Sequence, residues 1–487
     1  MGILQKFENR LEQMVSGVFA KAFRSAVQPV EVAAALQREV DNSAQILSRN
    51  RRLVPNQFHV ELSGQDHERL APYPMWLVYT GAWAFVGALS WVTTPVYLIR
   101  EVGMSPLQLV LAGTALEVAY SVFEVPTGVV ADLRGRRVSL VVAGVVMGAG
   151  MLLVGLVPNV AAVLAGMAVW GAGWTFRSGA EDAWLADETD PATMSRAYHR
   201  GAQVGRLARL LGLAAAAPLA LVDLSLPVVV AGGVAVAVAV LVAVAMPERG
   251  FVRPERTGGR MAHGLATTRA GAGVVRRTPV LLLVLGILLV LGAWQEGFDR
   301  LWEAHLLEDV GVPDLFGLAG VTWFSVIAAA VTILSFAVAA PLVRRWERLS
   351  PLRLARLLLG MHVLLFLGAA AFAFAGSWWL AVAAYLATSV VRDLTGPPFR
   401  AWLNGSITDS SHRATVLSLT SIAGSAGEWG GGPALGLLGN VYGVRAALAA
   451  GAALLLPTAG LFARAVRHHG VEPEVTAATT SGSAQPR

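Results

Sequence analysis

Two glutamates stand inside long apolar segments of this chain, where an ionisable side chain is costly. Glu117 lies eleven residues into the apolar run 106–131, and Glu428 lies beyond the middle of the run 415–441. A carboxyl group in a low-dielectric environment holds a proton more tightly than one in water, so it can pick up and release protons as its surroundings change. We take both as candidates for proton coupling. The structural alternative is a hydrogen-bonded carboxyl that packs two helices together.

Other charged residues in apolar segments are spaced so that they can pair. Arg177 and Glu181 stand four residues apart, as do Glu296 and Arg300, and this spacing brings two side chains to one face of a helix. The expected interior network comprises Arg177, Glu181, Asp182, Glu296, Asp299, Arg300, Arg392 and Asp393. It is either a set of static ion pairs that hold helices together or an exchangeable network in which a substrate or proton breaks one pair.

Tryptophans accompany these charges along the same segments. The candidates for a substrate-lining aromatic wall are Trp83, Trp91, Trp174 and Trp294, with Trp302 close by. Aromatic walls with few charges suit amphipathic or cationic organic molecules. The alternative is that tryptophans near the ends of apolar segments anchor them at a membrane interface.

The composition is that of a membrane protein. Of the 487 residues, 55% are hydrophobic and only 14% are charged, and the mean hydropathy is +0.58. A soluble protein carries roughly 25% charged residues. The chain has no cysteine and shows no protease, hydrolase or phosphate-loop motif. We therefore expect no enzyme activity, no cofactor, no bound metal and no ATP-driven pump.

Apolar runs of about 20 residues are long enough to cross a bilayer as helices. Twelve such runs follow residue 74, at 75–99, 106–131, 138–157, 160–185, 202–224, 226–246, 280–302, 315–343, 357–375, 377–399, 415–441 and 446–463. The expected fold class is an all-α membrane protein with twelve transmembrane helices in two parallel six-helix repeats, preceded by a small truncated α/β segment.

Arginine is concentrated in every second connection between these runs. The connection 247–279 alone holds seven arginines, whereas the intervening connections hold isolated ones such as Arg100. Basic loops stay in the cytoplasm, which explains the net charge of +6 better than nucleic-acid binding does. We expect a monomer in the bacterial inner membrane with both termini cytoplasmic. The predicted parts are a cytoplasmic segment 1–70, bundles 71–246 and 280–466, a basic linker 247–279 and a disordered tail 467–487.

An internal repeat supports two equivalent bundles. Ala183-Trp184-Leu185 is followed by Arg196-Ala197, and Ala401-Trp402-Leu403 is followed by Arg413-Ala414, at nearly the same offset. Parallel six-helix repeats build one large class of membrane transporters.

A short basic turn joins the second and third apolar runs. It contains Gly128, Asp132, Gly135, Arg136 and Arg137. This pattern resembles the loop between the second and third helices of major facilitator superfamily transporters, G-x-x-x-D-R/K-x-G-R-R/K, although Leu133 stands where the family prefers a basic residue. The resemblance implies a cytoplasmic gate in which Asp132 faces the start of the eleventh helix, near Arg413 to Thr415.

Two further expectations concern this gate. Arg136 and Arg137 would find partners in Asp187 or Glu188, at the inner end of the fourth helix. Glu124, seven residues after Glu117 on the same helical face, would serve the gate or stabilise the turn rather than contact substrate.

Residues 1–70 hold 17 of the 70 Asp, Glu, Lys and Arg residues, which indicates a segment in water. Two amphipathic helical patterns and a short alternating strand are predicted there. The segment resembles the domain that precedes a forkhead-associated module in bacterial cell-wall regulators. It is either a working regulatory domain or the result of a gene fusion.

The resemblance to the superfamily implies secondary transport by alternating access. We expect a lipid bilayer, protons and a small-molecule substrate as partners, with proton-coupled efflux of small amphipathic compounds as the function. Uptake of a metabolite by symport is the alternative transport function. A membrane anchor or sensor for residues 1–70, without transport, is the alternative of another class.

Overall fold

The computed structural model describes residues 70–252, 279–314, 320–346, 349–406 and 413–471. Contacts divide the chain into two units, 1–67 and 68–487, and the second unit is described here by itself. The expectations for segment 1–70, for most of the linker 247–279 and for nearly all of the tail 467–487 lie outside the described residues.

The first bundle consists of helices α3 (Pro72–Trp91), α4 (Thr94–Arg100), α5 (Pro106–Arg134), α6 (Arg136–Leu156), α7 (Val160–Ser178), α8 (Ala180–Glu188), α9 (Pro191–Val222) and α10 (Leu226–Ala245). Local sequence sets several boundaries. Ser105 and Gln108 form a capping box at the start of α5, and proline occupies its first turn. The runs expected as single spans at 75–99 and 160–185 are each broken into two helices, at Val92–Thr93 and at Gly179.

The second bundle consists of α12 (Pro279–Ala304), the π-helix η2 (His305–Val310), α13 (Gly320–Trp346), α14 (Pro351–Ala373), α15 (Trp378–Ser406), α16 (Arg413–Tyr442) and α17 (Val444–Val471). Ten segments of the described chain are long and apolar enough to cross a membrane, and α15 and α16 extend over 29 and 30 residues but are more polar. The expected all-α class of this part is confirmed. The seventh span is longer than 280–302, because η2 continues it to Val310.

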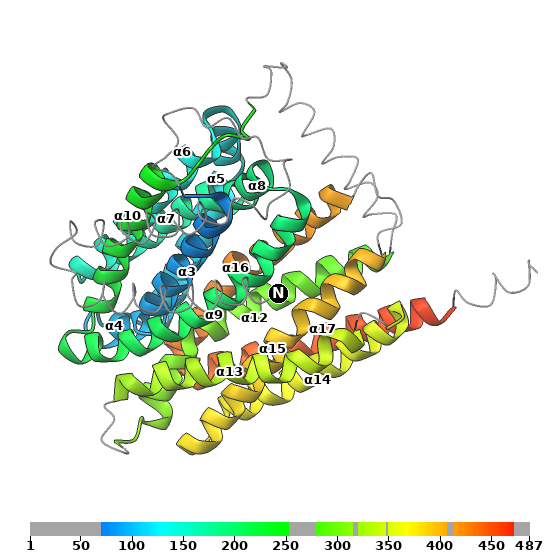
Figure 1. Cartoon of the computed structure of the whole chain (residues 1–487). Helices are drawn as coiled ribbons and strands as arrows, with labels where there is room; N and C mark the ends of the chain where they lie inside the picture. Colours follow the sequence, from blue (N-terminus) through cyan, green and yellow to red (C-terminus); the bar gives the residue numbers. More distant parts are fainter. Residues whose placement is uncertain (1–69, 253–278, 315–319, 347–348, 407–412, 472–487) are drawn as a thin grey trace, which may run out of the picture. The chain divides into compact units, whose positions relative to one another are not determined.

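Helix packing repeats between the two bundles (Figure 1). In the first bundle α3 packs on α9, α6 on α10 and α5 on α7; in the second α12 packs on α16, α14 on α17 and α13 on α15. These pairs occupy equivalent places in a six-helix repeat. Across the bundles α5 packs on α16 and α9 on α13, which is also a reciprocal pair.

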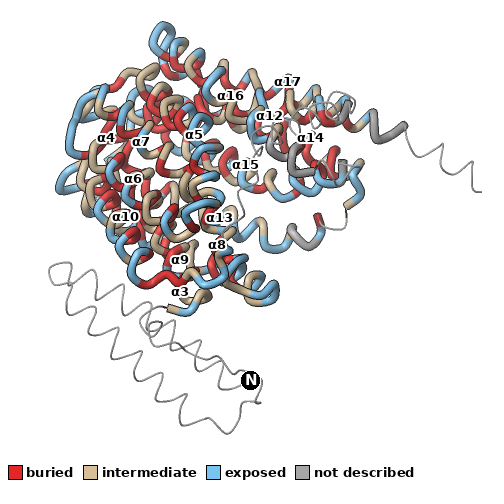
Figure 2. Tube along the Cα trace, turned by 90° about the horizontal axis from the view of Figure 1, so that it is seen from above, coloured by how far each residue is buried: buried red, intermediate tan, exposed pale blue. Residues whose placement is uncertain are grey.

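Close helix contacts depend on glycine at several crossings. A Cβ atom at Gly148 of α6 would lie 2.8 Å from the carbonyl oxygen of Gly232 in α10, so that only a hydrogen fits between these helices. Buried positions accordingly follow the helix faces that meet one another (Figure 2). In the second bundle they include one cluster around Trp402 and Phe462, to which α12, α14, α15 and α17 contribute.

This unit has two opposite ends, which we call the Gly135 end and the Gly103 end. The Gly135 end carries the turn between α5 and α6, where Gly135 has φ of 107°. The Gly103 end carries the turn before α5, where Gly103 has φ of 69°, and the α16–α17 turn at Gly443, with φ of 89°. Glycine fits each turn because other residues rarely adopt positive φ.

Candidate functional site

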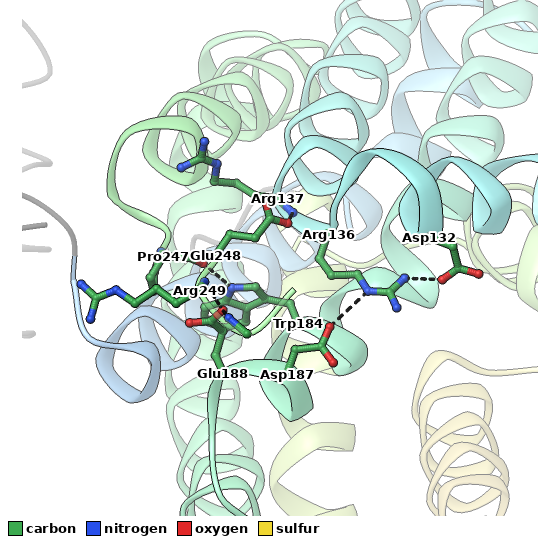
Figure 3. Close-up of polar contacts among 10 residues, drawn as sticks. Asp132, Arg136, Arg137, Trp184, Asp187, Glu188, Pro247, Glu248 and Arg249 are labelled. Carbon is green, nitrogen blue, oxygen red and sulfur yellow. Dashed lines mark hydrogen bonds and ion pairs between the residues drawn. The ribbon is translucent and has the colours of Figure 1, made fainter. Parts of the chain in front are cut away.

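The turn at the Gly135 end is held by a chain of ion pairs (Figure 3). Arg136 Nη1 donates to Asp132 Oδ1 at 2.6 Å, and Arg136 Nε donates to Asp187 Oδ2 at 3.4 Å. Asp187 belongs to α8, so the turn is tied to the end of the fourth span as expected for Arg136. Asp132 has its partner in its own turn; the side chains of Arg413 to Thr415 lie outside the described set, and a contact there stays a prediction.

The hydrogen-bond partners of Arg137 differ from those expected from the sequence. Its main-chain N–H donates to Glu248 Oε1 at 2.8 Å, and its guanidinium donates to the carbonyl oxygen of Met246 at 3.5 Å. Glu188 instead accepts the main-chain N–H groups of Arg249 and Gly250 at 2.5 and 2.7 Å. The expected pairing of Arg137 with Asp187 or Glu188 is therefore wrong: carboxylates satisfy exposed main-chain donors here, at a helix start and in an extended segment.

The beginning of the basic linker is thus fastened to the first bundle. Trp184 Nε1 donates to the carbonyl oxygen of Pro247 at 2.7 Å, next to the two bonds of Glu188 (Figure 3). Trp184 is the tryptophan of the sequence repeat. Its function in the first repeat is to anchor the chain where it leaves α10.

The remaining gate residues lie along α5. Glu124 is exposed, and its Oε2 accepts a bond from Ser178 Oγ of α7 at 3.4 Å. Gly128 has nothing within 4 Å of the place where a Cβ would stand. Among the described residues, neither Glu124 nor Gly128 has a recorded contact with the second bundle.

Arg177 lies in an aromatic cage in the first bundle. Its Nε donates to Glu181 Oε2 at 2.7 Å, across the break between α7 and α8. Its guanidinium carbon lies 4.8 Å from the ring centroids of both Trp83 and Trp174, and 5.7 Å from that of Tyr79. The expected pair therefore forms, and aromatic faces partly compensate the charge for its lost hydration.

Asp182 belongs to a different contact. Its Oδ1 accepts the hydroxyl of Tyr198 at 3.0 Å, which connects α8 to α9. The sequence predicts one network for Asp182 and Arg177. The structure separates the two, because Asp182 directly follows Glu181, the partner of Arg177, and adjacent residues of a helix face about 100° apart.

The second bundle holds two ion pairs of its own. Arg300 Nε donates to Glu296 Oε1 at 3.0 Å within α12, and Arg392 Nη1 of α15 donates to Asp299 Oδ1 at 2.5 Å. Asp393 turns away from these pairs and accepts Ser335 Oγ of α13 at 2.7 Å. Asp299 is the most exposed member, at 43%.

The Glu296–Arg300 pair also touches the first bundle. A Cβ at Gly113 of α5 would overlap Glu296 Oε1 and would lie 2.7 Å from Arg300 Nη2. The guanidinium of Arg300 also stands 6.0 Å from the ring of Trp91. The glycine in α5 is therefore what allows this pair to lie between the two bundles.

Glu117 and Glu428 face each other between α5 and α16. Their carboxyl groups are close enough to interact, with Glu296 and Arg300 nearby. Both are only partly buried. Two carboxyl groups can form a hydrogen bond with each other only when one of them carries a proton.

Comparisons with known proteins agree with this architecture. A family profile described as Major Facilitator Superfamily matches residues 75–367. The chain belongs to the Major Facilitator Superfamily. A second profile, described as FhaA, N-terminal domain, matches residues 4–79.

Solved structures of transporters are similar to this major facilitator protein in fold. The nucleoside transporter NupG matches with a TM-score of 0.65 at 11% identity, covering 81% of this chain and 99% of that one. The peptide transporter POT in complex with sulfate gives 0.64 at 15% identity, with 81% and 94% covered. An inward-facing and occupied bacterial homologue of the human lysosomal transporter Spinster gives 0.60 at 16%, with 81% and 96% covered.

Only the amino-terminal segment matches a curated relative. It is 39% identical over 72 residues to the FHA domain-containing protein FhaA of Mycobacterium tuberculosis (strain ATCC 25618 / H37Rv), which is 15% of this chain. The chain spans 14% of that relative's length. The two family matches confirm both resemblances stated from the sequence.

The aromatic candidates of this major facilitator protein fall in different surroundings. Trp83 and Trp174 belong to the cage of Arg177, and Trp91 meets Trp170 edge to face at 5.1 Å. Trp294 is 1% exposed and packs against Phe298 at 5.2 Å between ring centroids, so in this conformation it lies in the helix core.

Sequence reasoning missed an ionisable cluster at the end of α12. Glu303 and His305 are both buried. His305 Nε2 lies 3.0 Å from the carbonyl oxygen of Phe372, and its Nδ1 lies 2.7 Å from Asp309 Oδ2. Either ring nitrogen of His305 can donate, and the tautomer decides whether Nε2 donates to the carbonyl oxygen of Phe372 or Nδ1 to the carboxylate of Asp309. The predicted span ended at residue 302, just before this cluster. The charged residues of the cluster were the signal in the sequence that could have revealed it.

Proposed function

We propose that this protein is a secondary active transporter that exports small amphipathic compounds in exchange for protons, by alternating access. We further propose that its arginine-rich turns and both termini are cytoplasmic, in the inner membrane of a bacterium, and that it acts as a monomer. The observation that carries the proposal is the contact between Glu117 and Glu428.

The contact between α5 and α16 is tight at the Gly103 end. The main-chain N–H of Leu107 donates to Asn440 Oδ1 at 2.8 Å. A Cβ at Gly436 would lie 3.0 Å from Leu107 Cα, and one at Gly439 would lie 2.8 Å from Pro106 Cβ. The two helices therefore close this end by direct contact between their backbones.

Toward the Gly135 end the same two helices present exposed apolar side chains. Val122 and Phe123 of α5 are 60% and 45% exposed, and Ile422 of α16 is 60% exposed. Glu117 and Glu428 lie between these regions, at the limit of the tight contact. With the Gly135 end cytoplasmic, this arrangement supports an inward-facing state.

The acid pair can connect this state to protonation. Two ionised carboxylates at close range repel each other strongly in a low-dielectric environment, and one shared proton removes the repulsion. Protonation therefore favours closure of the Gly103 end. Loss of the proton favours separation of α5 from α16, which opens that end.

A proton taken up from outside would thus drive the return to the inward-facing state. In exchange transport the substrate leaves in the outward-facing state before the proton binds. Aromatic surface beside paired charge, as around Arg177, is suited to amphipathic compounds. Because nucleoside and peptide transporters share this fold, symport of a metabolite is the second candidate: the same pair would then carry the proton with the substrate.

Proton flux in proteoliposomes tests the proposal. The purified full chain is reconstituted, a pH gradient is imposed, and a panel of amphipathic compounds and metabolites is added from either side. Wild type is compared with Glu117→Gln and Glu428→Gln, and with Glu101→Gln as a matched control, since Glu101 is exposed in the turn before α5. We expect substrate-driven proton flux to fall at least about tenfold in the first two variants only. Unchanged flux in both would remove the coupling assignment.

Removal of residues 1–70 tests the alternative function, a membrane anchor or sensor without transport. If substrate flux survives the deletion, the segment is an appendage to a transporter. If wild type shows no flux with any compound and the deletion abolishes only the recruitment of a partner protein, the chain is a membrane anchor or sensor.

A further inference from the structure

A carboxyl group with an unpartnered oxygen is buried in the second bundle, away from the Glu117–Glu428 pair. Glu303, on the last turn of α12, is 3% exposed, and its Oε2 has no hydrogen-bond partner among the described residues. The preceding residue, Trp302, stacks on Tyr385 of α15 with 4.1 Å between ring centroids. The carboxyl group is therefore buried, and an aromatic contact holds α12 against α15 at the neighbouring residue.

The arginines on α12 and α15 in this part of the bundle are already engaged. Arg300 is bonded to Glu296 at 3.0 Å, and Arg392 is bonded to Asp299 at 2.5 Å. The titratable and charged groups that face Glu303 are Asp299, Arg300 and Tyr385. Among these, Asp299 would repel an ionised Glu303, and Arg300 is shared with a competing carboxylate.

We propose that Glu303 is a second proton-binding site of this protein, occupied by a proton in the conformation described here. An ionised carboxylate without a partner in a low-dielectric interior costs far more than the neutral acid does. The ligand of this site is a proton rather than an organic cation, because the acid is buried and the described residues provide no ring of oxygen atoms for a metal ion.

The surrounding contacts give the proton a route of release. The Trp302–Tyr385 stack and the Asp299–Arg392 pair both connect α12 to α15. If α15 separates from α12 during the transport cycle, Glu303 meets water and Arg392 is freed from Asp299. The proton then passes to water, and water hydrates the new carboxylate. The π-helix η2 directly after Glu303 fits this role, since π-helical turns are frequent at functional sites.

The site can be tested without any transport measurement. Infrared spectroscopy of the purified full chain at neutral pH detects the C=O stretching band of protonated carboxyl groups. Glu303→Gln replaces the acid by a neutral group of the same shape, and Glu308→Gln, at an exposed position of η2, is the matched control. We expect the protonated-carboxyl band to shrink in Glu303→Gln only. A band of unchanged size in that variant would overturn the proposal.

Wild-type protein offers a second measurement that does not depend on a variant. Apolar carbodiimides react with protonated carboxyl groups in apolar surroundings, and mass spectrometry locates the adduct. Labelling at Glu303 should exceed labelling at Glu308 by about tenfold or more. Equal labelling, or loss of the Glu303 adduct on addition of sodium ions, would overturn a proton site.

The role of the site in coupling rests on the proposed function and is tested separately. In wild type we expect two protons per substrate, and in Glu303→Gln one. If wild type moves no protons, the proposed function fails while the infrared band can still establish the protonated acid. If flux is normal and the stoichiometry in Glu303→Gln is unchanged, the site has no part in coupling.

Discussion

The main-chain N–H of Arg137 donates a hydrogen bond of 2.8 Å to the carboxylate of Glu248, 111 residues further along the chain. Arg137 stands in the first turn of α6, and Glu248 follows α10, so an acid from the linker caps the helix that begins after the Gly135 turn. A negative charge at a helix start also interacts favourably with the helix dipole.

Loss of this cap should be measurable in the stability of the first bundle. We expect Glu248→Ala to cost about 1 kcal/mol, the usual value for a lost amino-terminal cap. Glu248→Gln should cost less because the amide oxygen still accepts. Thermal unfolding in detergent provides the measurement, with Glu101→Ala as the exposed control. An unaltered melting temperature in Glu248→Ala would contradict the assignment.

The turn itself requires glycine at residue 135. With φ of 107° and ψ of 155°, Gly135 has a backbone conformation that is essentially confined to glycine, and a Cβ there would lie 2.8 Å from Glu248 Oε1. We expect Gly135→Ala to destabilise the protein by about 1–3 kcal/mol. Gly128→Ala is the matched control: it adds a methyl group where nothing lies within 4 Å, inside a helix that alanine favours. Equal stability of the two variants would refute the argument.

Gly113 should be essential for the ion pair between the bundles. A side chain there overlaps Glu296 Oε1, so Gly113→Ala must displace the Glu296–Arg300 pair or push α5 away from α12. We expect a loss of about 1–3 kcal/mol, as for other overpacked sites, together with reduced transport. Gly424→Ala in α16, where a Cβ meets nothing within 4 Å, is the control. Thermal unfolding and flux assays measure both.

Closure of the Gly103 end should depend on pH through the acid pair. The chain has no cysteine, so Pro106→Cys with Gly439→Cys introduces a single cysteine pair where the Cβ atoms would be 2.8 Å apart. Because protonation of Glu117 and Glu428 removes their repulsion, we expect more disulfide formation as pH falls. Thiol reactivity changes in the opposite direction, so it cannot produce this trend.

The same cysteine pair provides its own control backgrounds. Added to Glu117→Gln with Glu428→Gln, it should show no rise in disulfide formation as pH falls, since neither amide ionises and only the thiol reactivity still changes. Added to Glu101→Gln, it should retain the wild-type dependence. A rise in disulfide formation at low pH that survives in the first background would show that another group controls closure.

Asp190 provides a pH effect outside the membrane-spanning segments. It caps α9, accepting the N–H groups of Ala192 and Thr193 at 2.9 and 3.0 Å, and its hydrogen bonds with Thr193 hold the pKa of Asp190 below its ordinary value. A lowered folded-state pKa means that the stabilisation is present at neutral pH and is lost as pH falls through that pKa. Asp190→Ala should therefore lower the melting temperature by about a degree or two at neutral pH, and the difference should vanish in acid. The exposed Asp314→Ala is the control; a difference that persists in acid would contradict the capping argument.

The presence of the long helices in this protein follows from the local sequence. Each apolar run is long enough to satisfy its own backbone hydrogen bonds within a bilayer, and that property needs no partner. The i,i+4 pairs Arg177–Glu181 and Glu296–Arg300 were predictable for the same reason, because the helix itself brings their side chains together. The repeat of Trp184 and Trp402 and the glycine–arginine turn were likewise sufficient to indicate the family.

Contacts between helices were decided only by the tertiary structure. Residue spacing does not state that Glu117 meets Glu428, that Arg392 bonds to Asp299 rather than to its neighbour Asp393, or that Glu248 caps α6. Those contacts depend on which helix faces pack together and at what height. A hydropathy pattern is a sum along one helix. Glu303 became significant only when the structure showed it buried, with one carboxyl oxygen unpartnered among the described residues and with Arg300 and Arg392 already paired.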